Sequence, residues 1–395
     1  MPRWDVWPRD ADLGRTFDPV SQWTSLTLVE RFNQPDSWTL TGPSSALSVF
    51  EAGMGCILDR DGEQVTSGQV KTLQRSAQVD EDTGAVEDVM TVAFESDLGD
   101  VYSRRTYQDP TDEITTTETF DVAYDKRTGA AEDLILGYIA SNLAPAAPIA
   151  GRRLTSLALP ISLGRGGTQT VSARMDDLGD LVAPLAEAAN LHITIRHDES
   201  TGTPRLLVVL EDVPDVSADV RFGPVNSAAT GLVTGWGYTL ERPAVTDVIV
   251  AAGGEGVARL YARYADPAAR TLWGRRREGF IDQRQTDDID EIAAAGEEAL
   301  EDGATPVTTW FTVADSADVQ YRRDYGVGYR VGVELPGLPD AVSDNVVREV
   351  TTTVDPTSER VSMVVGTPGA TVNSTKQAQR LARANARLNL IERSK

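Results

Sequence analysis

The sequence predicts a mainly β fold with an α+β segment between two barrel-like β domains. Apolar and polar residues alternate with the two-residue period of strands over residues 22–125, and strands return after residue 245. Between these regions, apolar residues recur at the spacing of helices. We predict a first barrel-like domain over residues 1–128, an α+β domain over 129–235, a second barrel-like domain over 236–372 with an inserted helix at about 288–302, and a C-terminal amphipathic helix over 373–395.

Two hairpins are predicted in the first β region. Apolar residues alternate with polar ones on both sides of the turn NQPD at residues 33–36. The second hairpin turns at Asp61-Gly62, because this dipeptide is a strong signal for a two-residue turn. Further strands are expected near residues 90–94 and 114–122, so the region forms a β-sandwich or a barrel.

The α+β segment contains two predicted helices followed by two strands. The second helix begins near Asp176 or Asp177, and Pro184 predicts a break or a restart inside it. Strands are predicted at residues 192–196 and 206–210. The first helix ends before Pro145 and has an apolar face made of Leu134, Ile135, Tyr138, Ile139 and Leu143.

Two glycine-rich stretches in the second β region resemble nucleotide-binding loops. AAGGEGVARL at residues 251–260 has Arg259 where a dinucleotide fingerprint needs a small residue, so we favour a turn between strands. DYGVGYRVGVELPGLPD at residues 324–340 contains Pro336 and Pro339, which exclude the helix that a phosphate loop needs. Its alternating apolar residues predict a strand with a turn after it.

Two helices are predicted towards the C-terminus. The inserted helix begins at Asp288 and ends at Gly303. The second covers the segment 374–395, which holds six basic residues and one acidic residue, Glu392. Its apolar stripe consists of Leu381, Ala384, Leu388 and Ile391. A basic helix on an acidic protein is expected to dock electrostatically onto a neighbour.

Composition limits the classes of function. The chain has 395 residues and a net charge of −23, from 60 acidic and 37 basic residues, so it should repel nucleic acid rather than grip it. Cys56 is the single cysteine, so an intrachain disulfide is impossible and folding in cytoplasm is expected. No apolar run reaches the length of a membrane span or a signal peptide.

Catalytic signatures are mostly missing. His192 and His197 lie five residues apart on one predicted strand and therefore face opposite sides, away from a recognisable nucleophile. Zinc motifs, a complete calcium loop and a P-loop are absent from the sequence. A glycosidase needs only two carboxylates in a cleft, so that possibility stays open. We predict no catalytic, metal or cofactor site, and we expect Arg275, Arg276 and Arg277 to pair with acidic groups of this chain or a neighbour rather than with phosphate.

Several segments, in order, resemble a family of tail-tip proteins of long-tailed phages that infect actinobacteria. The most specific are Arg152 with Arg153, the turn GGEG that leads to Arg259, the stretch GRRREGFID at 274–282, and the entry DYxxG at 324–328. In one departure, Tyr329 follows Gly328 where the pattern usually has Asp, so a turn held by that carboxylate must be held otherwise. The resemblance covers about residues 20–370. The family is similar to the baseplate hub protein of contractile phages.

The resemblance implies a homotrimer whose two barrel-like domains per subunit form a ring of six similar units. Such a ring joins a six-fold tail tube to a three-fold tip in the virion, after assembly in the host cytoplasm. The implied partners are the tube or distal-tail ring, a tip or fibre protein, the tape-measure protein, and DNA that passes without specific binding. Candidate channel-lining residues are Asp80, Glu81, Asp82, Asp112 and Glu113. Candidate interface residues are Leu381, Arg383, Leu388, Ile391, Arg275, Arg276 and Arg277.

The long acidic run at residues 80–125 has two interpretations. A solvated face is the ordinary role of fourteen carboxylates with two arginines, and a DNA-repelling channel wall is the specific one. Two other functions also stay open. One is a tail-associated cell-wall hydrolase, and the other is an adhesin that binds host glycans through exposed tryptophans such as Trp236 or Trp273.

Overall fold

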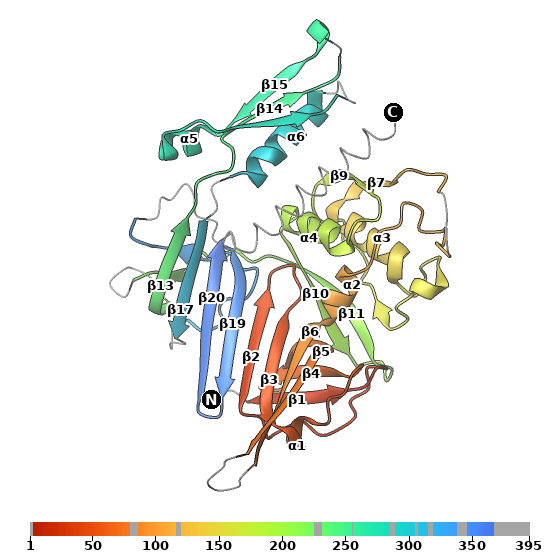
Figure 1. The fold of residues 1–395 in the computed structure, drawn as a ribbon, viewed down its shortest axis with the longest axis vertical. Helices are drawn as coiled ribbons and strands as arrows, with labels where there is room; N and C mark the ends of the chain where they lie inside the picture. The colour runs from red at the N-terminus through yellow and green to blue at the C-terminus, as the bar shows by residue number, and fades with distance from the viewer. Residues whose placement is uncertain are drawn as a thin grey trace.

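The computed structural model describes residues 3–79, 86–115, 120–224, 231–254, 256–284, 289–304, 307–314, 319–337 and 346–366. The predicted C-terminal helix lies outside the described residues, and so do Asp80, Glu81 and Asp82. Figure 1 shows a large sheet, a helical part beside it, and a small α/β module at the end of the molecule. None of the described helices is long and apolar enough to cross a membrane.

A ten-stranded sheet dominates the molecule and confirms the predicted mainly β fold. Its strand order is β1-β4-β5-β6-β3-β2-β19-β20-β17-β13. The N-terminal strands are β1 (Trp4–Arg9), β2 (Ser25–Arg31), β3 (Ser37–Pro43), β4 (Gly55–Arg60), β5 (Glu63–Val79) and β6 (Val86–Ser96). The C-terminal strands are β13 (Leu232–Leu240), β17 (Val307–Ala314), β19 (Val347–Asp355) and β20 (Ser358–Gly366).

The two β regions meet where β2 pairs with β19. The pairing is antiparallel and places Leu26 opposite Val354. The two cores also exchange residues across this seam. Val354 packs into the N-terminal core, and Phe32, just after β2, packs into the C-terminal core. In the described residues the sheet ends at β1 and β13 without closing into a barrel. The domain boundaries at residues 128, 235 and 372 stay a prediction.

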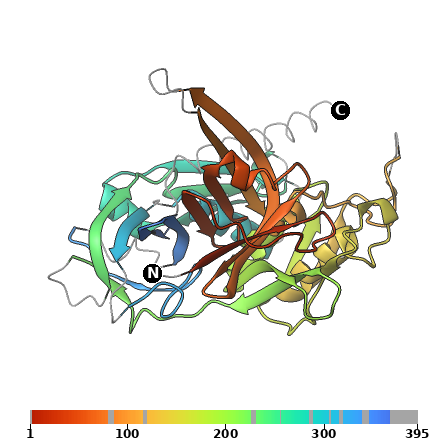
Figure 2. The same cartoon turned by 90° about the horizontal axis from the view of Figure 1, so that it is seen from below.

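Both predicted hairpins are present. In the first, Leu28 lies opposite Trp38, and the Trp38 ring stacks on Phe94 with the ring centroids 5.2 Å apart. In the second, Asp61 and Gly62 have φ angles of 55° and 85°. A two-residue hairpin turn of type I′ requires these positive angles at both positions. Beyond the body of the sheet, the β5–β6 hairpin extends as an arm (Figures 1 and 2).

The predicted helices and strands of the α+β segment are present, with one correction at Pro184. Its core packs α3 and α4 against β10 and β11. Pro184 lies inside α4, so the predicted break is wrong. Pro184 is exposed, and the helical hydrogen bond that it cannot make is therefore lost on the solvent side. Two short helices, α1 (Ser44–Leu47) and α2 (Asp97–Tyr102), belong in sequence to the N-terminal β region. The elements that follow are β7 (Asp125–Ala130), α3 (Ala131–Leu143), the 3-10 turn η1 (Ala150–Arg152), β8 (Leu157–Ala158), β9 (Thr168–Ala173), α4 (Leu178–Ala188), β10 (Leu191–Asp198), β11 (Arg205–Asp212) and β12 (Arg221–Phe222).

The small α/β module follows β13 and contains the inserted helix. It comprises β14 (Asp247–Ala251), the 3-10 turn η2 (Gly256–Ala258), β15 (Tyr261–Ala265), α5 (Pro267–Trp273), β16 (Glu278–Asp282) and α6 (Ile289–Asp302). The glycine-rich stretch at residues 251–260 connects β14 to its antiparallel neighbour β15, and its Gly254 has a φ of 104°. The predicted glycine turn is therefore confirmed.

The stretch at residues 324–340 is less regular than predicted. Its one named strand, β18, covers only Gly332–Val333. Gly328 has a φ of 87°, and this left-handed conformation interrupts an extended strand. The N–H groups of Gly328 and Arg330 donate to the carbonyls of Val347 and Pro214, so the segment binds different neighbours in turn. Tyr329 stands where the family pattern usually has Asp. Backbone hydrogen bonds, such as the one from Gly328 to Val347, hold the turn in place of that carboxylate.

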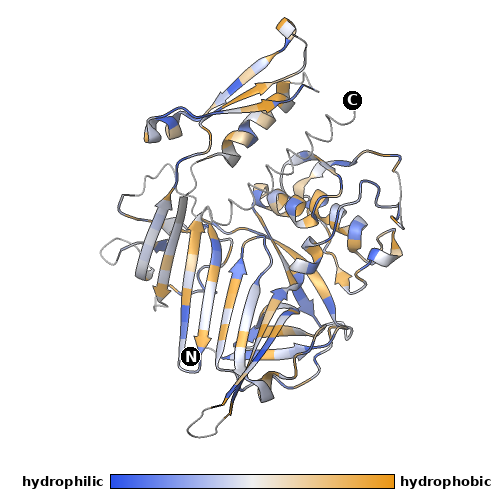
Figure 3. Ribbon diagram, in the orientation of Figure 1, coloured by the Kyte–Doolittle hydropathy of each residue, from blue (hydrophilic) through white to orange (hydrophobic). Residues whose placement is uncertain are grey.

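Apolar residues concentrate where these elements pack. In Figure 3, orange bands alternate with pale or blue ones along the large strands, and helices α3 and α4 carry orange stripes. This distribution agrees with one buried face for each sheet strand and each helix.

Candidate assembly surfaces

The two histidines occupy packing positions. His197 is buried, and its Nε2 lies 2.8 Å from the Leu13 carbonyl oxygen. His192 faces the other side of β10 and packs on the Phe32 ring, with the ring centroids 5.3 Å apart. Burial lowers the pKa of His192 to about 4. Cys56 lies in the N-terminal core, and burial raises the pKa of its thiol. These environments do not favour a nucleophile activated by a base.

A carboxyl group with a raised pKa lies beside a second carboxylate. Burial, with help from the negative charge of Glu30, raises the pKa of Asp36 to about 7. Its carboxylate accepts hydrogen bonds from the Arg31 N–H and the Thr66 hydroxyl, at 2.9 and 3.1 Å. Glu30 accepts from the Tyr321 hydroxyl at 2.7 Å. Protein groups therefore bind both carboxylates.

A polar cavity of about 240 Å³ lies between the β4–β5 turn and residues 320–323. Asp36 and Glu30 are not among its lining residues. The carboxylates that do line it, Asp61 and Glu63, are exposed at a hairpin turn. A glycosidase acid needs burial to raise its pKa, so this cavity gives the hydrolase alternative no support. Among the described residues, His, Cys, Asp and Glu form no group of three placed to hold a metal ion.

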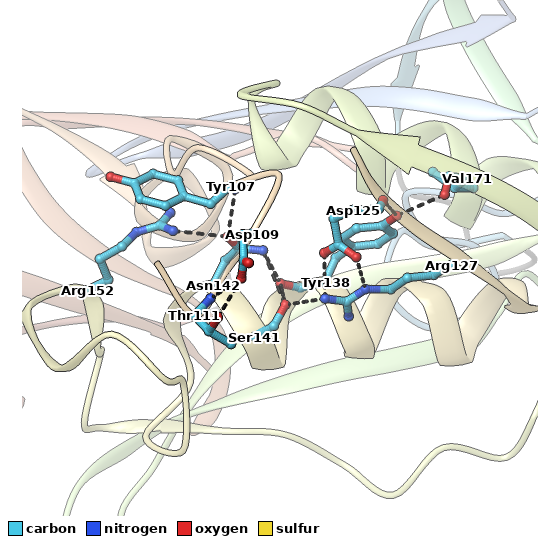
Figure 4. Close-up of polar contacts among 10 residues, drawn as sticks. All are labelled: Tyr107, Asp109, Thr111, Asp125, Arg127, Tyr138, Ser141, Asn142, Arg152 and Val171. Atoms are coloured by element: carbon cyan, nitrogen blue, oxygen red, sulfur yellow. Dashed lines mark hydrogen bonds and ion pairs between the residues drawn. The ribbon is translucent and has the colours of Figure 1, made fainter. Parts of the chain in front are cut away.

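The acidic candidates Asp112 and Glu113 lie on a loop that α3 holds in place. The guanidinium of Arg152 stacks on the Tyr107 ring, 3.8 Å from its centroid (Figure 4). Arg152 also donates from Nη1 to Asn142 Oδ1 at 3.1 Å, and the Tyr107 N–H donates to the same oxygen at 3.1 Å. Asn142 belongs to α3, so its side-chain amide links this helix to both Arg152 and Tyr107.

The same helix contacts the antiparallel pair of strands β7 and β9. Arg127 pairs with Asp125 at 2.6 Å and donates to the Ser141 hydroxyl at 2.7 Å. The Tyr138 hydroxyl donates to the carbonyls of Asp125 and Val171, at 2.9 and 3.1 Å (Figure 4). Helix α3 therefore binds both this strand pair and, through Asn142, the segment that leads into the acidic loop.

The loop itself presents acidic groups to solvent. Asp109 accepts hydrogen bonds from the Thr111 N–H and hydroxyl, at 2.9 and 2.6 Å, and closes a turn. Glu113 is exposed and Asp112 is half-buried. Asp80, Glu81 and Asp82 fall outside the described residues, so the grouping of the five candidates along one channel stays a prediction.

One of the candidate arginines, Arg276, joins Arg263 and Arg270 around a buried carboxylate that the sequence pattern does not reveal. Asp247 is 0% exposed, and it pairs with Arg263 and, at 3.4 Å each, with Arg270 and Arg276. Burial disfavours its charged form, but hydrogen bonds from Arg263 and Thr246 and the nearby arginines outweigh burial and lower the pKa of Asp247. An isolated Asp at the start of an apolar strand was the available signal.

The three predicted arginines have different surroundings. Arg276 pairs with Glu278 at 2.5 Å as well as with Asp247. Arg277 donates from Nε to the Ala244 carbonyl at 2.9 Å. Arg275 is exposed. Pairing with acidic groups of the same chain thus holds for Arg276, whereas Arg277 binds the backbone.

Arg259, at the end of the GGEG turn, has a structural role. Its guanidinium donates to the carbonyls of Ala252 and Ala251, at 3.1 and 3.3 Å, and pairs with Asp282 on β16. The side chain therefore ties the turn to both neighbouring strands.

Comparisons with known proteins agree with the fold. The family model described as "Siphovirus ReqiPepy6 Gp37-like protein" matches residues 3–367. No curated protein matches the chain. Among solved structures, the 43 kDa tail protein of prophage MuSo2 from Shewanella oneidensis has a TM-score of 0.56 at 13% identity, covering 93% of this chain and 99% of that one.

Two further tail proteins are similar over their full length. The tail protein from Neisseria meningitidis MC58 has a TM-score of 0.54 at 13% identity, over 93% of this chain and 97% of that one. The prophage tail protein gp18 from Listeria monocytogenes EGD-e has a TM-score of 0.51 at 10% identity, over 96% and 99% of the two chains. At these identities, the likeness shows a common fold.

Proposed function

The chain belongs to the siphovirus ReqiPepy6 Gp37-like family, and from this premise we propose that it is a hub subunit at the tip of a phage tail. Family and fold together make it a structural tail protein. In our proposal, three copies form a ring that joins the six-fold tail tube to a three-fold tip. The ring contacts the tube or distal-tail ring above and a tip or fibre protein below, and it surrounds the tape-measure protein.

The observation that carries the proposal is the shared fold over almost the whole of each chain. The match with the MuSo2 tail protein covers 93% of this chain and 99% of that one, so the likeness is not confined to one part of the chain. In our proposal, each of the two β regions that meet in the large sheet supplies one wall segment, so three copies would supply six. That number matches a six-fold tube above a three-fold tip.

The acidity of the chain suits passage of DNA through such a ring. Three copies, each with a charge of −23, would carry −69. A bore lined with carboxylates repels the phosphates of DNA from every side and offers no sites where it could bind. Asp112 and Glu113, on the loop held by α3, are described candidates for this wall. The basic segment 374–395 would dock on an acidic neighbouring protein.

Electron microscopy of the purified full-length protein tests the proposal, together with its mass in solution. We expect a three-fold ring with an open bore and, on tails labelled at this chain, density at the end of the tube. A monomer at all accessible concentrations that is absent from the tail end contradicts the hub. Clearing of peptidoglycan, or binding to a glycan array by such a monomer, would support the hydrolase or the adhesin instead.

A further inference from the structure

The small α/β module has one covered and one open sheet face. Its three strands lie in the order β15-β14-β16, and β14 pairs antiparallel with β15 and parallel with β16. Helix α6 covers one face. The residues that meet there are Val248 and Val250 of β14, Tyr264 of β15, Ile281 of β16, and Ile292 and Leu300 of α6.

The opposite face has an apolar centre that the described part of the chain leaves exposed. Ile249 of β14 lies opposite Arg263 of β15 and opposite Phe280 of β16. Phe280 is 61% exposed, and Tyr261, two pairs from Arg263 along β15, is 57% exposed. Large aromatic side chains exposed on an open sheet face contribute strongly to binding when a partner covers them.

Arginines surround this centre. Residues 256–284 contain seven arginines and three carboxylates, on a chain whose overall charge is −23. Arg263, Arg270 and Arg276 converge on Asp247 at one end of the face, and Arg259 and Arg284 converge on Asp282 at the other. Each carboxylate neutralises one charge, so the face keeps an excess of positive charge. We call it the arginine face.

The helix on the other side of the module has the opposite charge. The segment Ile289–Asp302 contains six carboxylates and no lysine or arginine. Among its residues, Glu297 and Glu298 are exposed, and so is Ile289, at 72%. The outer surfaces of this two-layer module are therefore basic on the sheet side and acidic on the helix side.

We propose that the arginine face binds the acidic outer surface of α6 on a second copy of this chain. Each module would then contact its two neighbours head to tail around the ring. Such a heterologous contact makes a closed ring when the rotation between copies allows it. The inference rests on the proposed hub function, because it assigns the contact that holds neighbouring copies in register.

Other occupants of the arginine face fit less well. The basic segment 374–395 of the same chain has the same sign of charge and would be repelled. DNA would need arginines free to meet phosphates along a track, whereas several arginines here are paired with Asp247 and Asp282 around an aromatic centre. A protein surface with carboxylates and an exposed Ile289 matches both the charge and the apolar centre.

A charge-swap series on the full-length protein tests this contact. The single variants Arg275→Glu and Glu298→Arg place like charges in the interface, and each is expected to raise the protein concentration for half-assembly by about tenfold or more. The double variant in one chain exchanges the signs and should recover most of the assembly. Phe280→Ser should weaken assembly similarly, through lost apolar contact. Arg275 is chosen because it is exposed and directly precedes Arg276 in the loop at the Asp247 end of the arginine face, and because, unlike Arg263, Arg270 and Arg276, it does not pair with the buried Asp247.

Arg360→Glu, the same charge reversal at an exposed position on β20, is the matched control and should assemble like the unaltered protein. Mass photometry across a concentration series gives the assembly, and circular dichroism verifies that each variant is folded. Rings that form equally well in all variants would overturn this contact and leave the hub intact. If the unaltered protein forms no ring, the hub itself fails. Loss of duplex DNA retention in Arg275→Glu with unchanged rings would assign the face to DNA and also overturn the proposal.

Discussion

At the scale of single residues, Asp36 couples the fold to pH. It lies between β2 and β3, where its carboxylate binds the Arg31 N–H and the Thr66 hydroxyl. Burial raises its pKa from 3.8 to about 7, so the folded chain binds the proton more tightly than the unfolded chain. The stability that Asp36 contributes is therefore fully present below about pH 4 and is lost as the pH rises towards 7.

Asp36→Asn should reduce this loss because the amide has no charge to bury. We expect the variant to gain stability relative to the unaltered protein between pH 5 and pH 8, by on the order of 1 to 2 kcal/mol after allowance for partial exposure. Urea unfolding at several pH values measures the difference.

His192 changes the stability with pH in the opposite direction to Asp36. The effect of Asp36 is therefore measured by comparing Asp36→Asn with the unaltered protein at each pH. Its lowered pKa makes stability fall as the pH drops from about 6.5 towards 4. Asp12→Asn, at an exposed position, is the matched control and should leave the pH profile unchanged. A profile for Asp36→Asn that is parallel to the unaltered one would contradict the assignment.

The residue clusters show why sequence reasoning found only part of the candidate surfaces. The stretch 275–277 was visible because its three arginines are adjacent. Asp247 was not, because Arg263, Arg270 and Arg276 reach it from a strand, a helix and a loop. Neighbours in space that come from three separate elements leave no local spacing that a sequence can reveal.

At the scale of elements, α4 contains a proline that it would be more stable without. Pro184 has no N–H to donate to the carbonyl four residues earlier, and its ring crowds that carbonyl. Because Pro184 is exposed, alanine can replace it without leaving a core cavity. Pro184→Ala should raise the free energy of unfolding by about 1 to 3 kcal/mol, as measured by denaturant titration.

Pro267→Ala is the matched control for this substitution. Pro267 is the first residue of α5, after the N-cap Asp266, where a helix does not use the N–H that proline lacks. That exchange should be close to neutral or slightly destabilising. Equal changes in the free energy of unfolding at the two positions would show that Pro184 does not destabilise α4.

Local signals explain which elements were predicted correctly. The Asp61-Gly62 hairpin, α3 and α6 depend on turn residues and periodicities within a few residues, and the structure contains all three. The prediction of a continuous strand after residue 324 was wrong, because the backbone hydrogen-bond partners of this stretch change along it. Tertiary contacts, which the local pattern does not contain, decide that conformation.

At the scale of the whole molecule, the seam between β2 and β19 makes the two β regions depend on each other. Val354 of β19 fills the N-terminal core, and Glu359 accepts hydrogen bonds from the Trp4 indole and from Arg60, at 2.9 and 2.8 Å. The non-local pairing was beyond sequence reasoning, which treated the two regions as separate domains.

A fragment of residues 1–128 should therefore not behave as an independent unit. Without the C-terminal strands, β2 becomes an unpaired edge strand, and such edges promote aggregation. We expect the fragment to aggregate or to self-associate in size-exclusion chromatography. Addition of a peptide of residues 346–366 should restore a monomeric complex with cooperative unfolding.

The same peptide with Val354→Asp is the control, since it keeps the backbone partner and introduces a charge into the core. We expect the Val354→Asp peptide to restore little of the monomeric complex. A fragment that is monomeric and unfolds cooperatively by itself would instead support the domain boundary predicted at residue 128.

The β2–β19 seam also constrains how the chain is made. About 315 residues separate the end of β2 from the start of β19. At translation rates of roughly 5 to 20 residues per second, the ribosome delivers the second strand roughly 15 to 60 s after the first. During that interval the nascent N-terminal half has an open strand edge, so a chaperone or a neighbouring nascent chain can reach it before its own partner exists.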